Sequence, residues 1–158
     1  MDWAGWALFG VVATAVLTAV MIAAQLMGWT RLDLPLMLGT IVTEDPDHAR
    51  VFGFFMHLTI GEGFALGYAA MFALLGAATW WLGALFGLVH VGLALTVLVP
   101  LLPGVHPRMA SDRAGPASVA VLEPPGLLGL NYGARTPLVA IVSHVAFGVA
   151  LGVLLKAR

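Results

Sequence analysis

Residues 51–102 read VFGFFMHLTIGEGFALGYAAMFALLGAATWWLGALFGLVHVGLALTVLVPLL, a stretch with no Asp, Lys or Arg and a single Glu. A helix crosses a bilayer with about 20 apolar residues, so this stretch is too long for one span and suits two. The break is expected within Ala77–Gly83, where a tight hairpin puts Trp80 and Trp81 in the aromatic belt of one membrane face. The stretch therefore predicts a transmembrane hairpin.

The rest of the chain extends this pattern to four spans. The 158 residues are 61% hydrophobic and 9% charged, whereas about a quarter of the residues in soluble domains are charged. We predict an integral membrane protein of the all-α class, a four-transmembrane-helix bundle with two irregular connections on one face. It is expected to be a single transmembrane domain over residues 1–158, with helices at about 3–29, 46–78, 80–102 and 137–155.

The two membrane faces differ in this topology. Face A is defined as the side with both termini and the predicted hairpin turn, and face B as the side with the connections 30–50 and 103–136. In the first connection, Asp45 suits a helix N-cap and Pro46 the first helical position. In the second, the apolar residues within Pro125–Gly133 are expected to pack on the bundle and cover a polar cup. The prolines of the second connection argue against a long helix there.

Ionisable side chains inside these spans are the strongest indication of function, because they are costly in hydrocarbon unless they face a protein interior or a water-filled cavity. Counting 1.5 Å per residue from face B, His57 and His144 both lie about 10 Å deep. Glu62 and His90 both lie about 18 Å deep. Glu62 is about 140° around its helix from His57, which argues against a single four-ligand site.

Glycine pairs predict where the helices approach each other closely. A small-xxx-small pair occurs at Gly63 and Gly67, at Gly83 and Gly87, and at Gly148 and Gly152, a pattern typical of close helix contact in membranes. The pairs of the third and fourth helices lie toward face A. The bundle is therefore expected to be closed near face A and to leave a blind polar cup toward face B.

Three functions fit these features. The first is binding, with or without transport, of a zinc- or iron-like divalent metal ion by His57, Glu62, His90 and His144, because imidazole and carboxylate are ligands for such metals. The second is electron transfer by a b-type haem (haem b) between His57 and His144, which share a depth on different helices. The third is a helix-packing accessory subunit or an oligomeric channel component.

Composition limits the remaining possibilities. The chain has no cysteine, which excludes disulfides and thiolate metal sites. Seven Lys and Arg against eight Asp and Glu leave no basic excess for binding nucleic acid. An enzyme is less expected, because no serine or lysine nucleophile is placed beside a base. The expected partners are the lipid bilayer and either further copies of the chain or the other subunits of a membrane complex.

Several short motifs also suggest a relationship to other proteins. They are His90, Pro103-Gly104-Val105-His106-Pro107-Arg108-Met109, Asn131-Tyr132-Gly133, and Thr136-Pro137 followed by His144. With these motifs, residues 50 to 152 resemble small four-helix bacterial integral membrane proteins of unassigned function. The resemblance implies the same topology and a bacterial inner (cytoplasmic) membrane, but it implies no activity and no ligand.

Overall fold

The computed structural model describes residues 3–111 and 122–155, and this part of the chain is helical without a named strand. Four of its helices are long and apolar enough to cross a membrane: Gly5–Leu26, Pro46–Leu75, Trp80–Val105 and Thr136–Leu154. These helices indicate an integral membrane protein and confirm the predicted all-α class. They are α1 (Trp3–Leu26), α3 (Pro46–Leu75), the continuous run of α4 (Trp80–Leu93), η1 (Ala94–Leu98) and α5 (Val99–Val105), and α6 (Thr136–Leu154).

The helix boundaries follow local signals. Asp45 is the N-cap of α3, as predicted, and its carboxylate accepts hydrogen bonds from the backbone N–H groups of Asp47 and His48. Helix α3 ends at Gly76, whose φ of 63° lies in the left-handed region that glycine tolerates. Thr79 then caps α4. The predicted hairpin turn is therefore present, but it occupies residues 76–79 and so begins one residue before the predicted range Ala77–Gly83.

The third span differs from the prediction, because the helix continues past Leu102 to Val105. It does so through a π-helical segment, η1, that ends two residues before Pro100. A proline ring inside an α-helix clashes with the carbonyl four residues earlier, and the wider π turn leaves room for it. The prolines therefore distort this helix and do not end it.

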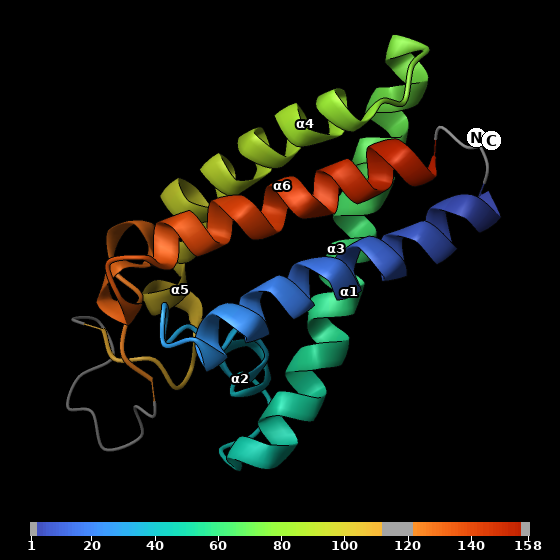
Figure 1. Cartoon of the computed structure of the whole chain (residues 1–158). Coiled ribbons are helices and arrows are strands. Elements are labelled where there is room, and N and C mark those ends of the chain that lie inside the picture. The colour runs from blue at the N-terminus through green and yellow to red at the C-terminus, as the bar shows by residue number, and fades with distance from the viewer. Residues whose placement is uncertain (1–2, 112–121, 156–158) are drawn as a thin grey trace.

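The long helices pack in a row, with one helix crossing it. Helix α6 lies between α1 and α4, and α3 crosses α1 at a steep angle (Figure 1). Helix α3 meets α4 mainly through aromatic side chains, and its backbone rarely comes close to that of α4, η1 or α5. The face B half of α3 and the η1–α5 segment are therefore splayed apart.

The tight contact between α4 and α6 depends on glycine, as predicted. A Cβ atom at Gly87 would lie 2.5 Å from the carbonyl oxygen of His144, and Gly83 and Gly148 approach each other more closely still, each with its Cβ position against the carbonyl oxygen of the other. Gly63 and Gly67 were wrongly predicted to make such a contact, because a Cβ atom at either position would meet nothing within 4 Å. The buried glycines of α3 are instead Gly53 and Gly61.

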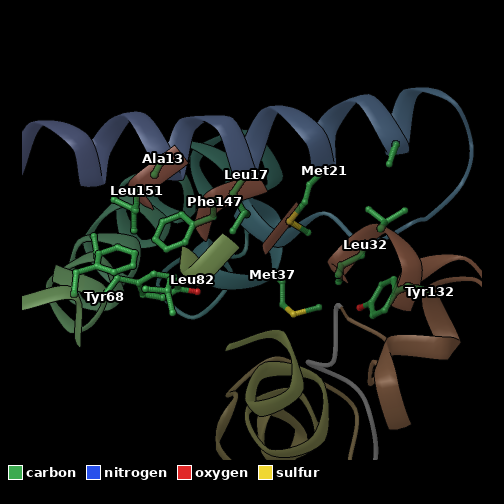
Figure 2. Packing of buried hydrophobic residues seen from close by; sticks show 14 of the residues in the cluster. Ala13, Leu17, Met21, Leu32, Met37, Tyr68, Leu82, Tyr132, Phe147 and Leu151 are labelled. Atoms are coloured by element: carbon green, nitrogen blue, oxygen red, sulfur yellow. The ribbon is translucent and has the colours of Figure 1, made fainter. Parts of the chain in front are cut away.

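The apolar core runs along α1 and α6. Ala13, Leu17 and Met21 of α1 point toward the side of α6 that carries Phe147 and Leu151 (Figure 2). A short helix, α2 (Leu34–Gly39), closes the face B end of this core and packs on α3. Its buried Met37 belongs to the same cluster.

Candidate functional site

A cavity of about 250 Å³ fills the space between the splayed helices. Residues from all the described helices except η2 line it, and most of the lining is aliphatic or aromatic. The exceptions are a threonine and three histidines: Thr14, His57, His90 and His144. The three intramembrane histidines singled out in the sequence thus border one cavity. It lies in the face B half of the molecule, away from the close glycine contacts of α4 and α6.

The ends of the cavity are closed by different elements. Toward face B the lining includes Leu32, Leu34 and Leu38, from the first connection and α2. Toward face A, Phe64 and Phe147 border the cavity, and Phe147 lies edge-on to Tyr68 with ring centroids 5.3 Å apart. Tyr68 continues this aromatic layer to Phe86 at 5.7 Å. The cavity is therefore blind toward face A.

His57 is held in a defined orientation from its Nδ1 side. It is buried on α3, and its Nδ1 lies 3.2 Å from Thr18 Oγ1 on α1. The Thr18 hydroxyl donates its hydrogen to the carbonyl of Thr14 at 2.8 Å, so the Nδ1–H of His57 is the donor to Thr18 Oγ1. This assigns the tautomer with an unprotonated Nε2, and the ring borders the cavity.

His144 has the same arrangement through a different partner. Its Nδ1 donates to the carbonyl of Ala140, one turn earlier in α6, at 2.8 Å. Nε2 therefore carries a free lone pair. His57 and His144 are two hydrogen-bond acceptors on different helices at the border of the same cavity.

His90 is held mainly by ring contacts. It stacks on Phe64 with centroids 3.8 Å apart and meets His144 edge-on at 4.7 Å. Its Nδ1 lies 3.4 Å from the hydroxyl of Tyr68. The predicted depth match between His90 and Glu62 does not bring these two residues together, because His90 faces the cavity and Glu62 does not line it.

Glu62 faces α1 instead. A Cβ atom at Gly10 would lie 2.6 Å from both carboxylate oxygens of Glu62. Among the described residues, no three His, Cys, Asp or Glu side chains lie close enough together to hold a metal ion. The angular offset of Glu62 from His57 around α3 accounts for the position of Glu62 outside the histidine cavity.

The segment predicted to cover the cup packs on the helices but does not line the cavity. Helix η2 (Leu127–Tyr132) contacts α6, η1 and α5, and Leu128 packs on Val91, Leu95 and Ala140. The covering role was therefore assigned to the wrong connection, because Leu34 and Leu38 of α2 line the cavity and no residue of η2 does. The order of the elements along the chain does not show which of the two face B connections contacts the cavity.

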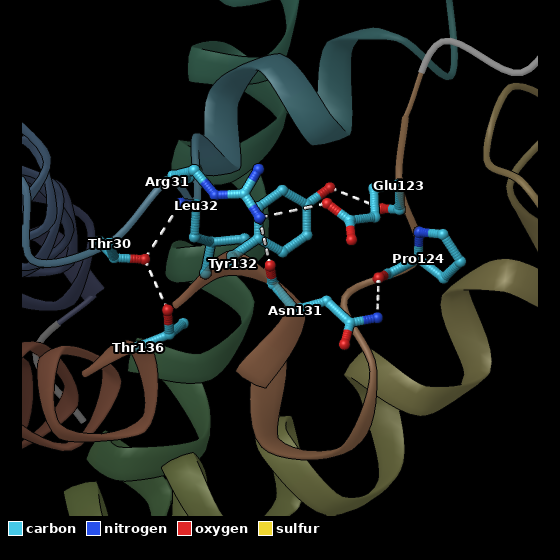
Figure 3. Close-up of polar contacts among 8 residues, drawn as sticks. All are labelled: Thr30, Arg31, Leu32, Glu123, Pro124, Asn131, Tyr132 and Thr136. Carbon is cyan, nitrogen blue, oxygen red and sulfur yellow. Dashed lines mark hydrogen bonds and ion pairs between the residues drawn. The ribbon is translucent and has the colours of Figure 1, made fainter. Parts of the chain in front are cut away.

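Hydrogen bonds join the two face B connections to each other (Figure 3). The backbone N–H of Arg31 donates to the carbonyl of Tyr132 at 2.8 Å, and its guanidinium reaches Glu123 at 3.3 Å. Thr30 and Thr136 share a hydrogen bond of 2.7 Å between their hydroxyls. Burial, together with the nearby Glu123 carboxylate, raises the pKa of Tyr132, whose hydroxyl donates to the Glu123 carbonyl.

His106 and Arg108 also have structural roles. The buried His106 donates from Nε2 to the carbonyl of Met37 at 2.9 Å and accepts at Nδ1 from the backbone N–H of Arg108. Arg108 donates to the carbonyls of Thr40 and Ile41 just after α2. These bonds hold α2 over the face B end of the cavity.

Sequence reasoning missed two residues of the site, Thr14 and Thr18. Both are buried, Thr14 lines the cavity and Thr18 orients His57. With Gly10 they recur at every fourth position of an otherwise apolar helix, so they lie on one stripe. That spacing was the available signal. Gln25, another polar residue of α1, donates to the carbonyl of Leu32 and does not line the cavity.

The cavity borders the part of the molecule that a bilayer would surround. Two of its lining residues, Ile60 of α3 and Leu98 of η1, are 43% and 42% exposed. They lie on the two elements that splay apart, at a depth where lipid tails are expected. The lining of the cavity therefore continues onto the surface of α3 and η1 that faces the membrane.

Comparison with known proteins adds no further assignment. No protein-family model matches the chain, and neither the curated proteins nor the solved structures include a significant match.

Proposed function

We propose that the protein binds a small, mostly apolar molecule with a hydroxyl group, such as a hydroquinone or phenol ring, in the cavity between α3, η1 and α6. One observation carries this proposal: His57 and His144 both use Nδ1–H within the protein, so each has an acceptor Nε2 beside an otherwise apolar space. Such a pair accepts hydrogen bonds from hydroxyl groups. A four-helix bundle in a bacterial inner membrane is the proposed setting.

The size of the cavity limits the ligand. An apolar cavity of about 150 Å³ holds benzene, and pockets for drug-sized molecules begin at about 300 Å³. The volume of about 250 Å³ therefore suits one or two rings. Haem is much larger, and it requires α3 and η1 to separate further than they do here.

The direct test is binding of tetramethylhydroquinone and its oxidised quinone to the purified protein, measured by calorimetry in detergent. The hydroquinone should bind more tightly than the quinone, because the quinone has no O–H to donate. His57→Ala and His144→Ala should each weaken binding of the hydroquinone. His48→Ala, at an exposed position outside the cavity, is the matched control. Equal binding by the parent and the double variant His57→Ala, His144→Ala would overturn the proposal.

Metal binding by the same histidines is a second candidate, supported by one feature of the site, and haem binding would in addition require α3 and η1 to separate further. Histidines that ligate metals usually donate their other ring N–H to a carbonyl, hydroxyl or carboxylate, as His57 and His144 do. A metal held by this pair needs further ligands from a bound molecule, from water or from another copy of the chain, because Glu62 lies on a different side of α3.

Elemental analysis and an optical spectrum of the protein distinguish this candidate. We expect a metal or haem bound here to be lost when either His57 or His144 is replaced by alanine. The double replacement should cause no further loss, because the two ligands act as a unit. Equal metal and haem content in the parent and the double variant would exclude both groups at this site. Absence of metal, haem and hydroquinone binding would favour an accessory or channel-lining subunit.

A further inference from the structure

We propose that Glu62 is a proton-binding site within the membrane, separate from the histidine cavity, and that its carboxyl group carries a proton at neutral pH. The proposal rests on the surroundings of the side chain. Both carboxylate oxygens are buried, and neither has a hydrogen-bond partner among the described residues. An ionised carboxylate without a partner in such a place costs several kcal/mol, and the protonated acid avoids this cost.

The site is shaped for the carboxyl group. The Glu62 head lies against α1 where Gly10 leaves room, since a Cβ atom there would lie 2.6 Å from either oxygen. One turn along α1, the Thr14 hydroxyl is occupied by its bond to the Gly10 carbonyl at 2.8 Å. The indole N–H of Trp6 donates to the backbone carbonyl of Glu62, at 3.1 Å, and fixes α1 against α3 at this level. The niche is therefore built by two helices.

None of the helices around the niche supplies a counter-charge. Between Trp3 and Leu26, α1 has no Asp, Glu, His, Lys or Arg. The only such residue in α6 is His144, which lines the cavity, as do His57 of α3 and His90 of α4. The charged residues near the start of α3, up to Arg50, are more than three turns away from Glu62. No side chain among the described residues therefore neutralises an ionised Glu62, which favours the protonated acid.

Labelling with dicyclohexylcarbodiimide tests this state, because this apolar reagent enters membranes and reacts with protonated carboxyl groups. The carboxyl proton moves to a carbodiimide nitrogen as the carboxylate oxygen attacks the central carbon, and an O-to-N shift leaves a stable N-acylurea. Peptide mapping by mass spectrometry should find several-fold more adduct on Glu62 than on the exposed Glu44 at neutral pH. The Glu62 adduct should decrease at alkaline pH. Adduct no greater than that on Glu44 would overturn the proposal.

Further variants and a second measurement distinguish a protonated Glu62 from a Glu62 that reacts only because the carbodiimide can reach it. The infrared difference spectrum between the parent and Glu62→Gln should contain the C=O band of a protonated carboxyl at neutral pH, and absence of this band would refute the proposal. Gly10→Ala should displace the carboxyl group and increase its reaction with a water-soluble carbodiimide. Gly63→Ala is the matched control, since its Cβ meets open space. Equal reactivity in these two variants would show that Gly10 does not form the niche.

Discussion

At the scale of single residues, the consequence of a side chain depends on the direction in which its helix presents it. His57 and Glu62 are five positions apart on α3, yet one faces the cavity and the other α1. The depth below face B, counted along each helix, correctly placed His57 and His144 at the same cavity, because this depth follows from the rise per residue. It could not give the angular position of Glu62 relative to neighbouring helices, which depends on how α3 crosses them.

The same distinction applies to glycines and gives a prediction. Gly87→Leu and Gly148→Leu should each destabilise the protein by about 1–3 kcal/mol or more, because the new side chain meets backbone atoms that cannot move aside. Gly63→Leu should leave stability nearly unchanged, since no atom lies within 4 Å of its Cβ position. Thermal unfolding in detergent measures all three. Similar melting temperatures for Gly148→Leu and Gly63→Leu would contradict the close contact between α4 and α6.

At the scale of elements, local signals predicted helix starts better than helix paths. Asp45 and Pro46 marked the start of α3, because capping depends on residues adjacent in sequence. The π turn before Pro100 was not predicted, and neither was Leu128, whose φ of 57° is unusual for a non-glycine residue. The π turn accommodates the ring of Pro100, and Leu128 packs on Val91, Leu95 and Ala140, which are distant in sequence. Lipid-facing and interior surfaces are similarly apolar, so residue pattern alone does not orient such elements.

The cap of α3 gives a prediction about pH. The backbone N–H of His48, and secondarily the nearby imidazole of His48, lower the pKa of Asp45 below its ordinary value. Its contribution to stability is therefore present above the unfolded pKa of about 3.9 and is lost as pH falls through the lower, folded value. Asp45→Ala should unfold at a lower temperature than the parent at neutral pH, and this difference should shrink in acid. Asp45→Asn keeps the cap without the charge, so its unfolding should depend less on pH.

At the scale of the whole molecule, a closely packed half and an open half are joined. The α4–α6 contact and the aromatic layer around Tyr68 close the face A half, and α3 diverges from η1 in the other half. The sequence predicted this asymmetry from its glycine pairs. It did not predict that α2 closes the cavity, because the contacts of α2 with His106 and Arg108 join segments far apart in the chain.

The length and slant of α3 predict that the protein is sensitive to bilayer thickness. Its 30 residues extend about 45 Å, compared with about 30 Å for a hydrocarbon core. A long helix adapts to a thinner bilayer by tilting further. Because α2 is fixed on α3 whereas α4 is fixed on α6, further tilt should widen the gap between α3 and η1. Affinity for tetramethylhydroquinone should therefore change between bilayers of short-chain and long-chain lipids, and equal affinity in both would show that α3 does not move. If the affinity does change, the lipid composition of the membrane sets how readily a ligand reaches His57 and His144.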